Sequence, residues 1–186
     1  FWRREMAQLR GKAGQGKFAI EVEPYELKQL FSLLSALPKE AQDEIRDRAQ
    51  FLSKRLAGQL LMFSQSAPAP QTRLVAQTIS TPRDRLIRVD IGGSKKVGRK
   101  YGGETSKNGK TRVRQQQAPA GALLWGTEFG GHGGEDSIGR RYTNRFSTPP
   151  KKSGYWINPA VDYYVPVVAR EYSQLIQEVS KRVGLA

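Results

Sequence analysis

The stretch "PKEAQDEIRDRAQFLSKRLAGQLLMFSQ", from Pro38 to Gln65, carries the strongest structural signal in this chain of 186 residues. Its apolar residues recur at steps of three and four, which predicts one buried face of a long α-helix. These residues are Ala41, Ile45, Ala49, Leu52, Leu56, Leu60 and Phe63. The other faces carry mostly charged and amide side chains, so we expect them to meet water or a polar partner. Gly58 costs about 1 kcal/mol inside a helix unless another group packs closely against it.

Weaker signals lie on both sides of this helix. Residues 1–20 are basic and weakly patterned, which favours a flexible arm, and a shorter apolar stripe predicts a helix from about Pro24 to Leu37. Residues 72–79 fit either a short helix or a strand. Further along, Ile87, Val89 and Ile91 alternate with polar residues, which predicts a half-buried strand.

The last part of the chain predicts a short strand followed by an amphipathic helix. The sequence "YWI" at residues 155–157 is typical of a strand. Asn158 and Pro159 then suit the N-cap and first turn of a helix whose apolar face includes Tyr172 and Val179. Pro166 removes a backbone donor, so we expect a kink or a preceding short turn there.

The charge of the chain points to an anionic partner. Its formal net charge is +14, and phosphate backbones are the commonest anionic partners of such proteins. The cations are dense in the loop at residues 93–120, which we interpret as a mobile basic loop or an extended hairpin. Its candidate DNA or partner contacts are Lys95, Lys96, Arg99, Lys100, Lys107, Lys110, Arg112 and Arg114. A second irregular loop covers residues 131–153. No apolar run is long enough to span a membrane, so we expect no membrane partner.

Known catalytic and ligand-binding patterns do not fit. "GGETSKNGKT", at residues 102–111, ends like a phosphate-binding loop, but Glu104 stands where the first glycine is required. The chain has no cysteine, and His132 is its single histidine, so a zinc site would need carboxylates alone beside it, and the sequence "HGGED" gives poor support for one. We therefore expect no catalytic residues, no metal and no cofactor.

Aromatic residues are concentrated in the second half of the chain. Core packing is the plainer interpretation, and stacking on single-stranded bases is another. Aromatic residues are also enriched at subunit interfaces. The candidate interface residues are Trp125, Glu128, Phe129, Tyr155 and Trp156.

The order of these features resembles the neck and tail-completion proteins of long-tailed bacteriophages, a group related to the tail-completion protein of phage lambda. The resemblance covers roughly Pro24 to Gly184, and its closest motifs are Glu128-Phe129-Gly130 and the aromatic-x-x-Pro-Ala segment from Trp156 to Ala160. The sequence departs from the family pattern in three ways. Asn158 replaces a basic residue, Pro166 interrupts the last helix, and the two loops are longer than usual.

The resemblance implies an α+β fold in which long N-terminal helices and a C-terminal helix pack on a small antiparallel sheet. Residues 21–186 would form one domain with long basic, glycine-rich loops. It also implies a structural virion protein that forms a ring, expected to be a hexamer, between the capsid portal and the tail. Partners would be other copies, the adjacent connector, tail terminator or tail tube proteins, and viral double-stranded DNA. The protein would lie in the virion neck, and in the host cytoplasm during assembly. The alternative is a standalone nucleic-acid-binding protein without sequence preference, as the charge alone suggests.

Overall fold

The computed structural model describes residues 17–22, 35–101, 116–131 and 148–184. Within them the fold is α+β, as expected, with helices packed beside two small antiparallel sheets of two strands each. In chain order the elements are β1 (Lys17–Val22), α2 (Lys39–Ser66), α3 (Thr72–Ala76), β2 (Ile87–Gly92), β3 (Lys96–Tyr101), β4 (Gln116–Pro119), α4 (Ala120–Phe129) and α5 (Ile157–Arg182). The helix expected from Pro24 falls mostly outside the described residues.

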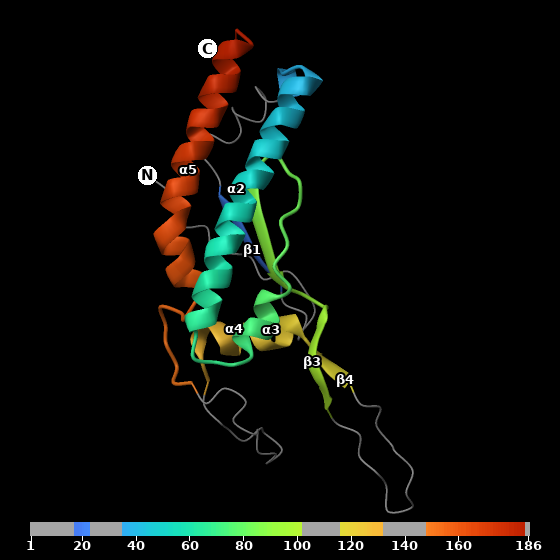
Figure 1. Cartoon of the computed structure of the whole chain (residues 1–186), viewed down its shortest axis with the longest axis vertical. Helices are drawn as coiled ribbons and strands as arrows, with labels where there is room; N and C mark the ends of the chain where they lie inside the picture. Colours follow the sequence, from blue (N-terminus) through green and yellow to red (C-terminus); the bar gives the residue numbers. More distant parts are fainter. Residues whose placement is uncertain (1–16, 23–34, 102–115, 132–147, 185–186) are drawn as a thin grey trace, which may run out of the picture.

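Helices α2 and α5 form an antiparallel pair along the length of the molecule (Figure 1). The long helix predicted from Pro38 is confirmed as α2, whose 28 residues span about 42 Å. Its apolar stripe is buried from Ala41 to Leu60, and Phe63 is half-buried at the end of the stripe. Ion pairs Arg55–Glu171 and Arg48–Glu178 join the two helices at the surface. Among the described residues, no helix has the length and apolarity needed to cross a membrane.

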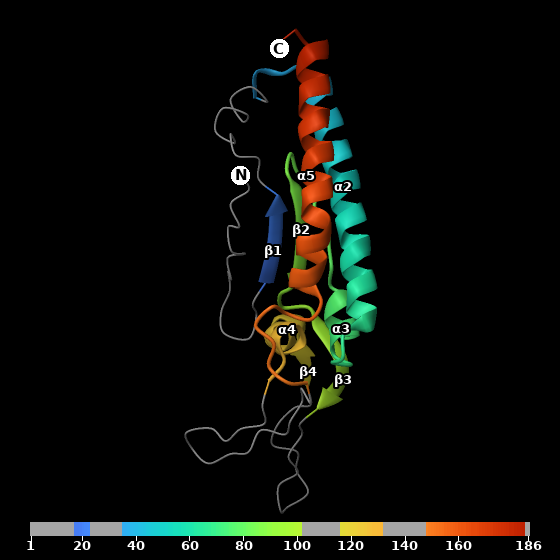
Figure 2. The ribbon, with the colours of Figure 1, turned by 90° about the vertical axis from the view of Figure 1, so that its left-hand side faces the viewer.

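The first sheet lies against this helix pair, with β2 between β1 and the helices (Figure 2). Strand β2 confirms the predicted alternation, because Ile87, Val89 and Ile91 are all buried. Asp90 differs from a solvent-facing strand residue, since only 5% of it is exposed. It is paired with Lys17 at 2.5 Å and with Arg88 at 3.1 Å.

The predicted C-terminal boundary of the N-terminal arm is wrong, because residues 17–20 belong to strand β1 and not to a flexible arm. The strand pairs in register with β2, and Ile20 is buried against the core. Lys17 contributes the cation that compensates Asp90. This pairing is a tertiary effect, so the local basic composition gives no sign of it. The arm residues 1–16 are outside the described part of the chain.

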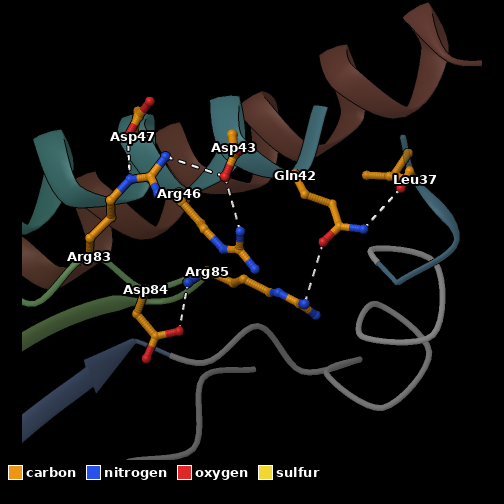
Figure 3. A network of polar contacts seen from close by, with 8 residues as sticks. All are labelled: Leu37, Gln42, Asp43, Arg46, Asp47, Arg83, Asp84 and Arg85. Atoms are coloured by element: carbon orange, nitrogen blue, oxygen red, sulfur yellow. Dashed lines mark hydrogen bonds and ion pairs between the residues drawn. The ribbon is translucent and has the colours of Figure 1, made fainter. Parts of the chain in front are cut away.

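A polar network fastens the segment before β2 to the first half of α2 (Figure 3). The Arg83 guanidinium donates to Asp47 at 2.6 Å and to Asp43 at 3.4 Å, and Arg46 donates to Asp43 at 3.0 Å. The bond from Arg83 holds the pKa of the Asp47 carboxyl below its ordinary value. Charged groups at this end of the molecule are therefore largely neutralised by one another.

Helices α3 and α4 and the second sheet lie at the opposite end, where α2 finishes and α5 begins (Figure 1). The ambiguous segment at residues 72–79 contains a short helix, α3, and not a strand. In the first basic loop, β3 pairs with β4, which agrees with the extended-hairpin interpretation.

Two expectations for the C-terminal segment are wrong. The sequence "YWI" does not form a strand, because Trp156 is the N-cap residue of α5 and Ile157 is its first residue. Asn158 is consequently inside the first turn and is not the N-cap. Pro166 lies inside α5, which continues through it to Arg182. Pro166 is on the exposed side of the helix, where a missing backbone donor is best tolerated.

Candidate functional site

Helix α4 organises the end of the molecule that holds most of the candidate residues. The sequence "AGALLWGTEF" forms this helix, with Leu123, Leu124 and Thr127 buried. Trp125 faces outward with 46% of its surface exposed, and its ring stacks on Phe129 with centroids 5.1 Å apart. Gly130 ends the helix with a φ of +72°, and a Cβ there would be 2.3 Å from the carbonyl oxygen of Pro149.

The Glu128 side chain joins α4 to the beginning of α5. Its Oε2 atom accepts hydrogen bonds from the backbone N–H groups of Trp156 at 3.2 Å and Ile157 at 2.7 Å. Its Oε1 atom accepts from the N–H of Asn158 at 2.9 Å. N–H groups at a helix start have no intrahelical acceptor, and the positive end of the helix dipole attracts a carboxylate. Glu128 therefore caps a helix that begins almost thirty residues later.

Gly154 makes room for this carboxylate. It has a φ of +76°, and a Cβ at this position would be 1.8 Å from Oε1 of Glu128. Backbone bonds close the same unit: Tyr155 N–H donates to the Glu128 carbonyl at 2.8 Å, and Lys151 N–H donates to the Phe129 carbonyl at 2.8 Å. The two short motifs that are closest to the family pattern thus form one interlocked structure.

The surroundings of Glu128 favour a structural role over a catalytic one. Only 2% of the residue is exposed, and both carboxylate oxygens are engaged by backbone donors. Burial raises the pKa of the Glu128 carboxyl above its ordinary value, while the backbone hydrogen bonds act in the opposite direction. Within the described residues, no group of three or more His, Asp or Glu side chains is placed to hold a metal ion.

The candidate interface residues divide into buried and accessible sets. Glu128 and Trp156 lie inside the protomer, Trp156 with no exposed surface, so this structure assigns them to the core and not to a subunit contact. Trp125 is exposed, whereas Phe129 and Tyr155 are half-buried. The Tyr155 hydroxyl donates to the carbonyl of Pro149 at 2.8 Å. These three aromatic side chains remain accessible to a partner.

The candidate cations of β3 are exposed at this same end. The beginning of β3 is attached to the beginning of α4 by bonds from Ala120 N–H to the Lys95 carbonyl and from Gly121 N–H to the Gly93 carbonyl, both 2.9 Å. Lys95, Lys96, Arg99 and Lys100 are all exposed, and the Lys95 ammonium donates to the carbonyl of Gln77 at 3.2 Å. The other four candidates, Lys107, Lys110, Arg112 and Arg114, lie outside the described residues.

Two further cations, Lys151 and Lys152, do not stand out as candidates in the sequence. Both are exposed, and the Lys151 ammonium lies 5.1 Å from the centroid of the Tyr155 ring. Their segment is bonded to the C-terminal end of α4, which brings them to the end of the molecule that also carries β3. We call the six residues the basic end: Lys95, Lys96, Arg99, Lys100, Lys151 and Lys152. In residues 93–101, 116–131 and 148–156, the single acidic side chain is the buried Glu128.

The sequence gives no local sign that Lys151 and Lys152 lie at the same end of the molecule as the β3 cations, because this placement depends on how residues 148–156 fold back on α4.

No family model, curated protein or solved structure matches this chain.

Proposed function

We propose that this chain is a structural protein of the neck of a long-tailed bacteriophage, a ring-forming tail-completion or head–tail connector component. It would join the tail to the portal complex of the capsid and surround the channel through which DNA passes. Its role would be mechanical and electrostatic, without a reaction.

The observation that best supports this proposal is the contact between the two family-like motifs. Short motifs that match a family by chance have no reason to touch each other. Here Glu128 of the first motif binds the backbone of Trp156, Ile157 and Asn158 in the second. The pair is therefore explained as one unit that sets how α5 leaves α4, and a shared fold would preserve such a unit.

The distribution of charge gives a second line of support. The described segments that carry the basic end, residues 93–101, 116–131 and 148–156, contain no acidic side chain other than the buried Glu128. The charges at the start of α2, in contrast, are paired with one another. A basic end attracts DNA phosphates or an acidic neighbouring protein without reading sequence. A protein that lines a channel needs attraction of this diffuse kind, because base-specific contacts would hold the DNA in one place.

The test is electron microscopy of lysates from the encoding phage after deletion of this gene. DNA-filled heads beside separate tails of normal length are the expected result, and adding the purified protein should restore joined particles. Tails of irregular length would assign the protein to tail termination instead. Joined, normal virions would refute a neck role.

A second candidate function is favoured by the basic end itself. A standalone protein that binds nucleic acid without sequence preference would also expose lysines and arginines on a projecting hairpin. Such a protein should bind a short DNA duplex when isolated, with an affinity that falls steeply as salt increases.

The two functions are separated by titrating fluorescent duplex DNA with the protein over a range of salt concentrations. In a standalone binder, changing Lys95, Lys96, Arg99 and Lys100 to Gln should lower the log–log salt slope by about 0.9 for each phosphate that is no longer neutralised. The charge-matched control changes four exposed cations of α2 and α5 to Gln: Lys39, Lys54, Arg170 and Lys181. For the neck protein we expect weak binding in isolation and near-equal slopes for the two variants.

A further inference from the structure

The long helices α2 and α5 carry large apolar side chains that are exposed in the protomer. Of the six large apolar residues that are exposed among the described residues, five belong to these two helices. Phe51, Met62 and Tyr163 are each more than 60% exposed, and Leu61 and Val167 are 42% and 40% exposed. Exposed groups scattered singly need no explanation, but a contiguous set marks an interaction surface.

The spacing of these residues places them on one surface. On α2, Arg55 is four residues after Phe51 and seven before Met62, so the three share a stripe. On α5, Glu171 is four residues after Val167, which is four after Tyr163. Because Arg55 binds Glu171 directly, the ion pair joins the two stripes side by side. We call this surface the outer face: Phe51, Gly58, Leu61, Met62, Tyr163 and Val167.

Gly58 gives the outer face its most unusual feature. It lies seven residues after Phe51 and four before Met62, in the middle of the apolar stripe. A glycine inside a helix is unfavourable by about 1 kcal/mol relative to alanine, and it is usually explained by close packing. A Cβ added at Gly58 would meet no described atom within 4 Å. The described part of the protomer thus gives no packing reason for this glycine, whereas a partner that approaches the helix backbone closely would.

Charge identifies the kind of partner. Helices α2 and α5 together carry eight Lys and Arg residues against seven Asp and Glu residues, a net charge of +1, while the whole chain carries +14. Two copies of such a chain repel each other in most relative orientations. They meet with least repulsion where the charge is balanced, and the outer face is both balanced and apolar.

The area of the face is adequate for such a contact. Taking about 200 Å² for each large side chain, the five exposed residues offer roughly 500 Å² of largely apolar surface. A standard interface buries about 800 Å² on each partner, including its polar rim. The charged and amide residues around the face would supply that rim.

We propose that the outer face of α2 and α5 binds a second copy of this chain, with the partner packed closely over Gly58. The inference rests on the proposed neck role for the expectation that copies assemble. It adds the surface through which they do so, and it leaves the basic end free for DNA or another protein. Flanking aromatic and methionine side chains would act as anchors around the glycine.

The test is sedimentation velocity of the full chain up to about 100 µM, well above the micromolar dissociation constants of weak specific contacts. The wild-type protein should associate as its concentration rises. Gly58→Gln and Phe51→Gln should each raise the dissociation constant about tenfold or more. Ser94→Gln, at an exposed turn residue outside the face, is the matched control and should associate like wild type. The melting temperature of dilute Gly58→Gln protein should not fall, which separates impaired association from impaired folding.

A wild-type chain that stays monomeric would overturn the inference, and so would unchanged association of both variants. Neither result depends on the microscopy of deletion lysates, which tests the neck role without reference to any face. Conversely, association through Gly58 would stand even if the deletion lysates contained joined virions.

Discussion

Replacement of Glu128 by alanine should weaken the fold more than any nearby surface change, because one carboxylate satisfies three backbone donors. The N–H groups of Trp156 and Ile157 are buried, and that of Asn158 is partly buried. All three N–H groups donate to this one side chain, so its truncation removes the acceptor of each. The start of α5 would lose its cap and its attachment to α4.

The size of the effect can be estimated from its parts. Loss of a helix cap costs about 1 kcal/mol, and each buried donor left unpaired costs about 1–3 kcal/mol. Release of the burial penalty on the carboxylate offsets part of this sum, so we expect a net loss of about 3 kcal/mol for Glu128→Ala. Glu128→Gln keeps one oxygen but turns an amide donor toward a backbone donor, and about 1–2 kcal/mol is expected.

Urea denaturation followed by circular dichroism measures these differences. Glu178→Ala is the control, because it removes an exposed carboxylate of the same α5 that is paired only at the surface with Arg48. Surface pairs contribute about 0–1 kcal/mol. If Glu128→Ala cost no more than this control, the assignment of Glu128 as the cap of α5 would be refuted.

The pH dependence gives an independent check on Glu128. Its pKa is raised in the folded state, mainly by burial, so the folded protein binds this proton more tightly than the unfolded chain. The resulting stability is fully present below the unfolded pKa and is lost as the pH rises through the folded value. The stability difference between wild type and Glu128→Gln should therefore be larger in mild acid than at neutral pH. A difference that shrinks on acidification would mean that the hydrogen bonds outweigh burial.

Three further predictions concern single residues. Gly154→Ala should cost about 2 kcal/mol more than Gly184→Ala in urea denaturation, because both glycines have a φ of +76° but only at Gly154 would the Cβ collide with Glu128. Equal costs would contradict the close fit. Asp90→Ala should lower the free energy of unfolding by about 3 kcal/mol, since it leaves two cations without their buried partner, and a loss under about 1 kcal/mol would argue against the pairing. Gly58→Ala should raise the stability of the dilute protomer by about 1 kcal/mol, and a decrease would show that the protomer itself packs against this position.

The elements that the sequence predicts best are those whose pattern is local. The apolar period of α2 and the alternation of β2 depend only on burial of one face, and both elements have nearly the predicted bounds. Strand β1 has no such local pattern, because its burial depends on β2, which lies about seventy residues later in the chain. In the sequence alone, Lys17 of this strand looks like part of a basic arm, because its partner Asp90 is distant in the chain.

The candidate site could be predicted only in part, for a related reason. Lys95, Lys96, Arg99 and Lys100 are exposed, as a run of cations without apolar period usually is, and their contact with DNA or a partner stays a prediction. Glu128 stands out through its motif, but the interface environment expected for it is wrong. An acidic residue within the apolar sequence "LLWGTEF" is a sign of a buried, paired carboxylate, yet nothing local indicates that its partners are backbone groups of a later helix. Asn158 fits the local rule for an N-cap residue, but α5 begins before it and Glu128 accepts the hydrogen bonds at the start of the helix.

The hydrogen bonds around Glu128 also have a consequence for how the gene can change. Gly131 N–H donates to the carbonyl of Thr148 at 3.1 Å. The bonds from Lys151 N–H to the Phe129 carbonyl and from Tyr155 N–H to the Glu128 carbonyl join the same two segments. Gly131 and Thr148 are therefore held side by side, whatever the length of chain between them. Doubling the length of a flexible loop whose ends are joined costs only about 0.6 kcal/mol in closure entropy. Insertions or deletions between Gly131 and Thr148 should accumulate freely among descendants of this gene, while α4 and α5 keep their places.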